Sequence, residues 1–348
     1  MNPWIIPIRP SEGIVQQLPY WCYFFGVTCS TSPFADSFEL YPNTFITDIV
    51  LEYYSISGSL PSEIGLFTKL KKFAMSGNVL VGSIPSSIGT MSSIDTLLLG
   101  GNYLTGRVPD AITRMNSLQF LDLSRNRLTG SIPYFFKIVN NLVSLSLSNN
   151  RLTNSIDAIV TLTRLKTLSL ENNKLSGPIP TEIGLYMRSL QFLRLGGNKL
   201  SSSIPDSMVA LTQLIYLSVK DNQLNGPIPF DIGSLINLEH LDISNNRLVS
   251  SLPTQLNLLT SLSFLNMSTN FLTAGSLSII GKTVIKSTVL PSSSLGYFDR
   301  FCNNCFFILY GDFVYYCPEI NTFDNHRTGC FNSLQPTTMP TSMPTYGE

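Results

Sequence analysis

The chain has 348 residues, and its 22 Lys and Arg balance its 22 Asp and Glu, so the formal net charge is zero. Hydrophobic residues make up 43% and charged residues only 13%, which excludes a disordered chain, because disorder requires low hydropathy and high net charge. Zero net charge also argues against binding to nucleic acid or to an anionic membrane, which depends on basic surfaces. The chain has two histidines, His240 and His326, too few for a His-rich site. We therefore expect neither a metal nor a cofactor.

The N-terminal segment, residues 1–10, reads MNPWIIPIRP. This short apolar run is interrupted by proline and follows no basic region, so it does not have the pattern of a signal peptide. No apolar run in the chain reaches the ~18–20 residues that a transmembrane helix needs. If the protein is exported, we expect its signal to lie upstream of residue 1.

From residue 46 onward, one sequence unit recurs about every 24 residues. Its frame is L-x-x-L-x-L-x-x-N-x-L, as in LQFLDLSRNRL (118–128), and most units continue as x-G-x-I-P-x-x-I-G. A first unit begins at Ile46 and has Tyr54 at the Asn position. The nine units after it carry the Asn itself, at Asn78, Asn102, Asn126, Asn150, Asn173, Asn198, Asn222, Asn246 and Asn270.

Each part of this frame has a structural meaning. The last two leucines of L-x-x-L-x-L alternate with polar residues, which predicts a short strand with one buried face. Successive units then stack their strands side by side into a parallel sheet. The Asn amide can donate and accept at once, so we expect it to be buried and to bond backbone groups of adjacent turns.

The repeated unit resembles plant-type leucine-rich repeats with the L-x-G-x-I-P signature. These occur in the ectodomains of receptor-like kinases and receptor-like proteins and in polygalacturonase-inhibiting proteins. The resemblance covers residues 46–275 and implies an α/β-type repeat solenoid, a right-handed superhelix of ten units with a parallel β-sheet on the concave face. It also implies a protein, peptide or glycan ligand and a co-receptor as partners, because this one scaffold serves many ligands.

A solenoid exposes its interior at both ends and therefore needs caps. Residues 22–29 read CYFFGVTC and resemble the family's N-terminal cap motif C-x-W-x-G-V-x-C, with Phe24 in place of Trp. The resemblance implies a disulfide between Cys22 and Cys29 within an N-terminal cap formed by residues 1–45.

Four more cysteines follow the repeats, namely Cys302, Cys305, Cys317 and Cys330. Four cysteines allow three connectivities, and the sequence does not choose among them. Residues 306–317 predict a hairpin over the open end of the solenoid, within a disulfide-stapled cap at 276–335. A zinc site or a redox dithiol at the C-x-x-C of Cys302 and Cys305 is an alternative, but no second ligand pair and no thioredoxin-like βαβ pattern accompanies it.

All six cysteines lie outside the repeats, and their even number indicates an oxidising compartment, so we expect an extracellular or cell-surface protein. Residues 336–348 are rich in Pro and Thr and predict a linker or stalk. One glycosylation sequon is present at Asn266.

Side chains that alternate with the inward leucines should face solvent on the concave face. In four successive later units the position before the second Leu is aromatic or His, and charged residues follow. We predict ligand binding by Phe120, Phe192, Arg194, Tyr216, Lys220, His240, Asp242 and Phe264, since aromatic side chains and Arg dominate many interfaces. The alternative is that the rings only stack on cross-strand neighbours.

Catalysis is not expected. Ser218, His240 and Asp242 would face the same way, but an open sheet supplies neither a pocket nor oxyanion donors. The first hypothesis is a non-enzymatic extracellular recognition module, receptor-like in function. The alternatives are a structural or adhesive cell-surface protein, an inhibitor of a secreted hydrolase, and an intracellular adaptor.

Two adjacent units depart from the regular length. The unit at 142–164 is one residue short and has Asn154 and Asp157 at the Gly and Pro positions, whereas the next unit is one residue longer at 184–190. One interpretation is a local irregularity that the neighbouring unit corrects. The other is a convex face re-aimed towards a partner.

Overall fold

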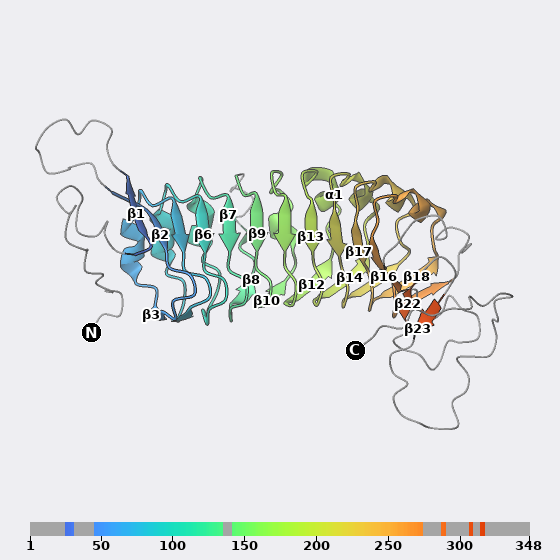
Figure 1. Cartoon of the computed structure of the whole chain (residues 1–348), viewed down its shortest axis with the longest axis horizontal. Helices are drawn as coiled ribbons and strands as arrows, with labels where there is room; N and C mark the ends of the chain where they lie inside the picture. The colour runs from blue at the N-terminus through green and yellow to red at the C-terminus, as the bar shows by residue number, and fades with distance from the viewer. Residues whose placement is uncertain are drawn as a thin grey trace, which may run out of the picture.

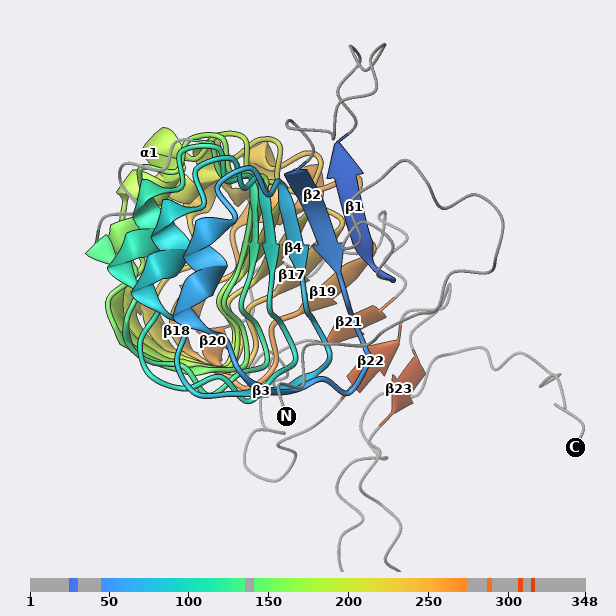
Figure 2. The same ribbon diagram turned by 90° about the vertical axis from the view of Figure 1, so that its left-hand side faces the viewer.

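A computed structural model describes residues 25–30, 45–134 and 141–273, together with the backbone of three short strands at 287–289, 306–308 and 314–316. The described turns stack along one axis into an elongated solenoid (Figure 1). Viewed along this axis, the main sheet, a second sheet and a row of short helices surround a common interior (Figure 2). Cys22, the four C-terminal cysteines and the Pro/Thr-rich segment 336–348 lie outside the described residues.

The main sheet runs along the solenoid, and its neighbouring strands pair in parallel from β2 to β21. At the N-terminal end β1 pairs antiparallel with β2, and at the other end β22 pairs antiparallel with β21 and with β23. The predicted hairpin within 306–317 is therefore present. The strands are β1 (Val27–Ser30), β2 (Phe45–Val50), β4 (Lys72–Ala74), β6 (Thr96–Leu98), β7 (Phe120–Asp122), β9 (Ser144–Ser146), β11 (Thr167–Ser169), β13 (Phe192–Arg194), β15 (Tyr216–Ser218), β17 (His240–Asp242), β19 (Phe264–Asn266), β21 (Ser287–Val289), β22 (Phe306–Ile308) and β23 (Val314–Tyr316).

Leucines of the repeat frame fill the interior. The central residue of each main-sheet strand from β7 to β19 is a Leu that pairs in register with its equivalents, as Leu193 does with Leu217. Both of these are at most 1% exposed. Burying one aliphatic side chain contributes about 1.5–3 kcal/mol, so stacked turns form a continuous core without a globular centre. The predicted parallel sheet and leucine-lined solenoid are confirmed.

A ladder of buried Asn side chains joins consecutive turns. In Asn126, Oδ1 accepts a hydrogen bond from the backbone N–H of Leu104 at 3.0 Å, and Nδ2 donates to the carbonyls of Leu99 and Leu123 at 3.0 and 3.1 Å. The same pattern recurs from Asn78 to Asn270. Each amide thus occupies backbone groups of two turns that would otherwise be buried without partners.

The second sheet was not predicted from the sequence. There the residues around the frame Gly of one unit pair in parallel with the residues around the Leu that follows the ladder Asn of the next unit, as Gly177 does with Leu200. The frame Gly takes a left-handed conformation, as Gly130 does at φ +80°. Asn154 (φ 69°), Ser202 (φ 66°) and Ser250 (φ 77°) adopt it without being glycine. The strands are β8 (Thr129–Ser131), β10 (Arg151–Asn154), β12 (Lys174–Pro178), β14 (Lys199–Ser203), β16 (Gln223–Gly226), β18 (Arg247–Ser251) and β20 (Phe271–Thr273), with β3 (Ser57–Ser59) and β5 (Val79–Val81) paired separately.

Short helices form the remaining side, and the helices of the two irregular units differ from those of the other units. The short unit has a three-residue 3₁₀ helix, and the longer unit has the α-helical turn α1 (Glu182–Tyr186). The strand register across both units is unbroken, with Ser144, Thr167 and Phe192 aligned. The 3₁₀ helices are η2 (Ser62–Leu66), η3 (Ser86–Thr90), η4 (Asp110–Arg114), η6 (Asp157–Ile159), η7 (Asp206–Ala210), η8 (Phe230–Ser234) and η9 (Thr254–Leu258).

Candidate functional site

Four rings at equivalent positions form a column across the outer surface of the main sheet. Tyr216 and His240 stack with centroids 4.0 Å apart and planes 8° apart, and His240 and Phe264 stack at 4.1 Å and 2°. The guanidinium carbon of Arg194 lies 4.4 Å from the ring centroid of Tyr216 and 5.4 Å from that of Phe192. We call these five residues, Phe192, Arg194, Tyr216, His240 and Phe264, the ring column.

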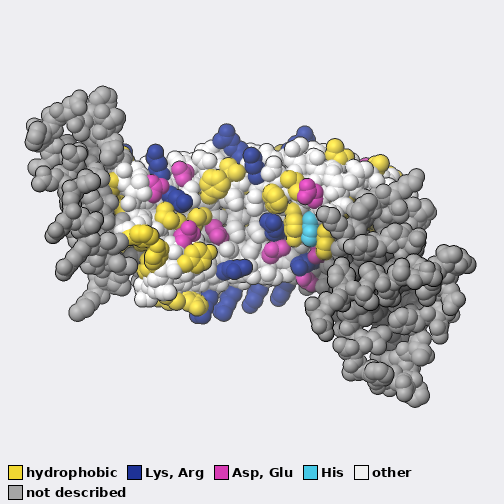
Figure 3. Space-filling model, in the orientation of Figure 1, with side chains coloured by type: hydrophobic (Ala, Val, Ile, Leu, Met, Phe, Trp, Pro, Cys, Tyr) yellow, Lys and Arg dark blue, Asp and Glu magenta, His cyan; other side chains and the backbone are white. Residues whose placement is uncertain are grey.

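The column follows from the strand register. Parallel strands place equivalent residues about 4.8 Å apart, close to the separation at which flat rings stack. Phe192, Tyr216, His240 and Phe264 are the first residues of β13, β15, β17 and β19, and they pair in register. Because each inner ring is covered on both faces by its neighbours, the ring edges are what the column presents to solvent. Figure 3 shows the histidine between hydrophobic side chains, with basic and acidic side chains beside it.

Charged residues line one side of the ring column. Glu171 is half-buried, and burial raises the pKa of its carboxyl, while Arg194 and Lys220 act in the opposite direction. Burial also raises the pKa of Tyr216. Glu171 was not among the predicted site residues, although its side chain lies at the outward position two residues beyond β11.

Two polar residues predicted to face solvent are buried instead. Asp242 is only 6% exposed, and its Oδ1 accepts hydrogen bonds from the Ser244 backbone N–H at 3.2 Å and hydroxyl at 2.6 Å. Ser218, on the neighbouring strand, is fully buried, and its hydroxyl has no hydrogen-bond partner among the described residues. The Ser218 hydroxyl therefore does not bond His240, and these residues do not form a nucleophile–base pair. Asp242 shapes the electrostatics of the column from below its surface.

Phe120 lies apart from the ring column. Its strand β7 is separated from β13 by β9 and β11, which carry Ser144 and Thr167 at the equivalent position. Phe120 is 42% exposed, and no other ring stacks on it among the residues that the structure describes. Of the predicted binding residues, the structure brings together Phe192, Arg194, Tyr216, Lys220, His240, Asp242 and Phe264 and leaves out Phe120.

Asn266, the residue of the glycosylation sequon, lies on β19 beside the column. Its Oδ1 accepts hydrogen bonds from the Ser268 backbone N–H at 3.2 Å and hydroxyl at 2.8 Å. Modification of this residue stays a prediction.

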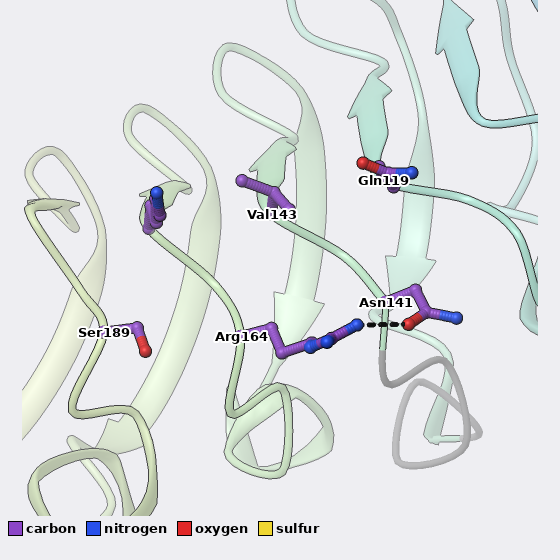
Figure 4. Close-up of a pocket in the computed structure, with 6 residues that line it drawn as sticks. Gln119, Asn141, Val143, Arg164 and Ser189 are labelled. Carbon is purple, nitrogen blue, oxygen red and sulfur yellow. Dashed lines mark hydrogen bonds between the residues drawn. The ribbon is translucent and has the colours of Figure 1, made fainter.

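A shallow recess of about 330 Å³ opens near the entry to the strands of the middle units (Figure 4). The guanidinium of Arg164 crosses it and donates to Asn141 Oδ1 at 2.8 Å. The lining residues are Gln119, Asn141, Val143, Arg164, Lys166 and Ser189. Val143 is the one hydrophobic residue in this lining, whereas ligand pockets are usually lined mainly by hydrophobic and aromatic side chains, so the ring column is the stronger candidate site.

The burial of His240 makes stability depend on pH. Burial lowers its pKa from the ordinary 6.5, Arg194 and Lys220 lower it further, and Asp242 raises it. The contribution of neutral His240 to stability is therefore fully present above pH 6.5. It decreases as the pH drops below that value, because the unfolded chain binds the proton more readily than the folded chain. We expect the Tm to fall between about pH 7 and about pH 5.5. The fall should be smaller in His240→Phe, which keeps the stack but cannot titrate; an equal fall would contradict the assignment.

Comparison with family profiles identifies leucine-rich repeats over two parts of the chain. Residues 68–128 match the profile described as "Leucine rich repeat", and residues 142–271 match "Leucine-rich repeat region". A search of curated proteins gives no match.

Solved structures of Arabidopsis thaliana receptors are similar. The ectodomain of the plant membrane receptor kinase GASSHO1/SCHENGEN3, in complex with CASPARIAN STRIP INTEGRITY FACTOR 2, is 33% identical with a TM-score of 0.65, covering 69% of this chain and 28% of that chain. The ectodomain of the receptor kinase HAESA, in complex with an IDA peptide hormone, is 31% identical with a TM-score of 0.65, covering 73% and 42%. A plant ice-binding protein shares the fold at 24% identity and a TM-score of 0.61, covering 73% and 79%.

These similarities and the geometry together define a leucine-rich repeat solenoid. The chain belongs to the plant-type leucine-rich repeat family and resembles receptor kinase ectodomains, as its sequence predicts. It spans less than half the length of the two receptor ectodomains. Among the residues described, no helix is both long and apolar enough to cross a membrane. The described part of the chain also has no group of three or more His, Cys, Asp or Glu placed to hold a metal ion.

Proposed function

We propose that this chain is an extracellular recognition module that binds a peptide or an extended protein segment along the ring column. The observation that carries the proposal is the continuous stack of Phe192, Arg194, Tyr216, His240 and Phe264 on an open sheet. Stacking holds these side chains in place, so a ligand meets a rigid ring column. The protein therefore loses little conformational entropy on binding.

The orientation of the rings favours a peptide over a neutral glycan. A sugar binds an aromatic side chain by laying its C–H bonds on an open ring face, but the faces of Tyr216 and His240 are covered within the column. Exposed ring edges suit apolar side chains and carbonyl oxygens, since the edge of an aromatic ring is electropositive. Beside the ring column, Lys220 can bind a negatively charged group of the ligand and Glu171 a positively charged one.

The relatives support the same ligand class. The two similar receptor ectodomains are described in complex with CASPARIAN STRIP INTEGRITY FACTOR 2 and with a peptide hormone. The proposal includes a receptor-like role for this chain, in which it acts with a co-receptor and a signalling partner. Cys29 is disulfide-bonded, which supports an oxidising, extracellular location.

The test is selection from a displayed random-peptide library. The variant has Phe192, Tyr216 and Phe264 changed to Ala. Peptide pools enriched on the wild-type protein should bind this variant about thirtyfold or more weakly than they bind the wild type. The reason is that aromatic anchors buried by the ligand contribute about 2 kcal/mol or more each when they dominate an interface. The rings are only half-buried, so the variant should keep a cooperative unfolding transition.

The matched control changes three exposed rings elsewhere, Phe120, Phe230 and Phe271, to Ala. The control should bind the enriched pools within about twofold of wild type, because no ring of the column is altered. Equal binding by the column variant, or an equal loss in the control, would contradict the proposed site.

A further inference from the structure

Exposed cations form a row along the edge where the second sheet begins. The residue between the ladder Asn and the following Leu is basic in four consecutive units and again two units later, at Arg127, Arg151, Lys174, Lys199 and Arg247. We call these five residues the basic row. All five are exposed, and four are the first residues of β10, β12, β14 and β18. Figure 3 shows basic side chains side by side along the lower edge, where Figure 1 labels β10, β12 and β14.

The row carries four consecutive cations, from Arg127 to Lys199, although the whole chain is neutral. It contains no acidic residue, and Gln223 occupies the position between Lys199 and Arg247. One acidic side chain, the exposed Asp221, lies beside the row in the unit that carries Gln223, where its Oδ1 accepts a hydrogen bond from Asn245 Nδ2 at 2.7 Å. A net charge of zero excludes a uniformly basic protein but does not exclude a basic edge.

The spacing within the row allows the charges to act together. Adjacent strands of the second sheet are staggered by two residues, since Thr153 pairs with Lys174 and Ser176 with Lys199. A strand separation of about 4.8 Å and a stagger of about 6.6 Å place equivalent residues about 8 Å apart. This is within the Debye length of about 10 Å at 0.1 M salt, so neighbouring charges add to one potential.

Uncharged polar groups flank Arg151 and Lys174, in the middle of the row, on both sides. Towards the strand interiors lie the hydroxyl residues Thr129, Thr153, Ser176 and Ser201. On the other side lie the exposed Asn149 and Asn172, whose amides bond each other at 3.1 Å. At the N-terminal end of the row, the Arg127 guanidinium lies over the ring of Tyr103 at 4.7 Å. From Arg127 to Lys199 the edge therefore offers one cation per turn, together with hydroxyl and amide groups.

We propose that the basic row binds a linear acidic polysaccharide, such as a polyuronate. Such a polymer carries carboxylates at regular intervals and hydroxyls between them, matching cations at regular intervals flanked by hydroxyls and amides. Each exposed cation contributes little by itself, but a polyanion neutralises four or five at once and releases their counterions. The row is separate from the ring column, so the chain can bind a polysaccharide and its other ligand together.

The composition of the edge favours a polysaccharide over other polyanions. Single-stranded nucleic acid is usually held by aromatic platforms among the cations, and between Arg151 and Lys199 the row has none. An anionic membrane requires a broad basic face with apolar anchors, whereas this row is one residue wide.

The test measures binding of the full chain to immobilised alginate at about 50 mM salt, where ionic contacts are weakly screened. Changing Arg127, Arg151, Lys174 and Lys199 to Gln should weaken binding about tenfold or more. Raising the salt should weaken wild-type binding steeply, with a shallower dependence in the variant because fewer counterions are released. Dextran, a neutral polymer, should not bind.

A matched control changes four exposed cations outside the row, Lys69, Lys71, Arg114 and Arg188, to Gln. Both variants carry the same net charge, so a loss confined to the row variant supports a site rather than a general charge effect. Equal losses in both variants, or no binding of alginate by the wild type, would overturn the proposal. Binding of a single-stranded oligonucleotide as tight as that of alginate would also overturn it. Thermal unfolding of both variants shows whether either change disturbs the fold.

Discussion

Replacing Asn198 with Ala is expected to lower the free energy of unfolding by about 3–5 kcal/mol, a large effect for one residue. Asn198 Oδ1 accepts from the backbone N–H of Leu175 at 3.1 Å. Its Nδ2 donates to the carbonyls of Leu170 and Leu195, each at 3.0 Å, and of Gly196 at 3.2 Å. Alanine leaves these backbone groups in the interior without partners, and each such loss costs about 1–3 kcal/mol, partly relieved by entering water.

The position of Asn198 increases the effect, because the ladder joins neighbouring turns. A solenoid is stabilised by the interface between each unit and the next, so a weakened interface in the middle can uncouple its two halves. Denaturant unfolding followed by circular dichroism should show a lower midpoint, together with a broader transition if the halves separate. The control is Asn225→Ala at an exposed position of β16, which should change stability by less than about 0.5 kcal/mol. A loss below about 1 kcal/mol at Asn198 would contradict the structural role of the ladder.

The main sheet could be predicted because residues at the same position of successive units occupy equivalent places in the structure. The period places Leu193 beside Leu217, and the need to satisfy buried backbone groups assigns a role to the recurring Asn. The second sheet could not be predicted in the same way. Its pairing depends on the backbone direction set by left-handed residues such as Gly130, and no alternation of polar and apolar side chains marks the segment.

The candidate site was predictable to the extent that it depends on register. Aligning the units is enough to place His240 between Tyr216 and Phe264, as the structure shows. The burial of Asp242 depends on the side chains of neighbouring strands, which a repeat frame does not specify. The basic row is visible in the sequence as N-R-L and N-K-L, but a net charge summed over the whole chain averages this local charge to zero.

Adding one methyl group at Gly184 is expected to destabilise the protein by about 2 kcal/mol, although Ala is the better helix former. Gly184 lies in α1, where Ala would ordinarily contribute about 0.8–1 kcal/mol relative to Gly. A Cβ atom at this position, however, would overlap the carbonyl group of Ser207 in the next turn. A backbone carbonyl cannot rotate away as a side chain does, so the turns must separate, and overpacking of this kind costs about 1–3 kcal/mol or more.

The steric cost of the added methyl group should therefore exceed its gain in helix propensity. This difference explains why glycine follows isoleucine in several helical segments. Equivalent overlaps with a backbone carbonyl of the next turn occur at Gly65, Gly89 and Gly233. The following unit has Val209 at this position, which shows that its neighbouring turn leaves room for a side chain. Val209→Ala should consequently cost less than about 1 kcal/mol in the same thermal and denaturant measurements. If Gly184→Ala instead raised the Tm, helix propensity rather than close contact between turns would govern this face of the solenoid.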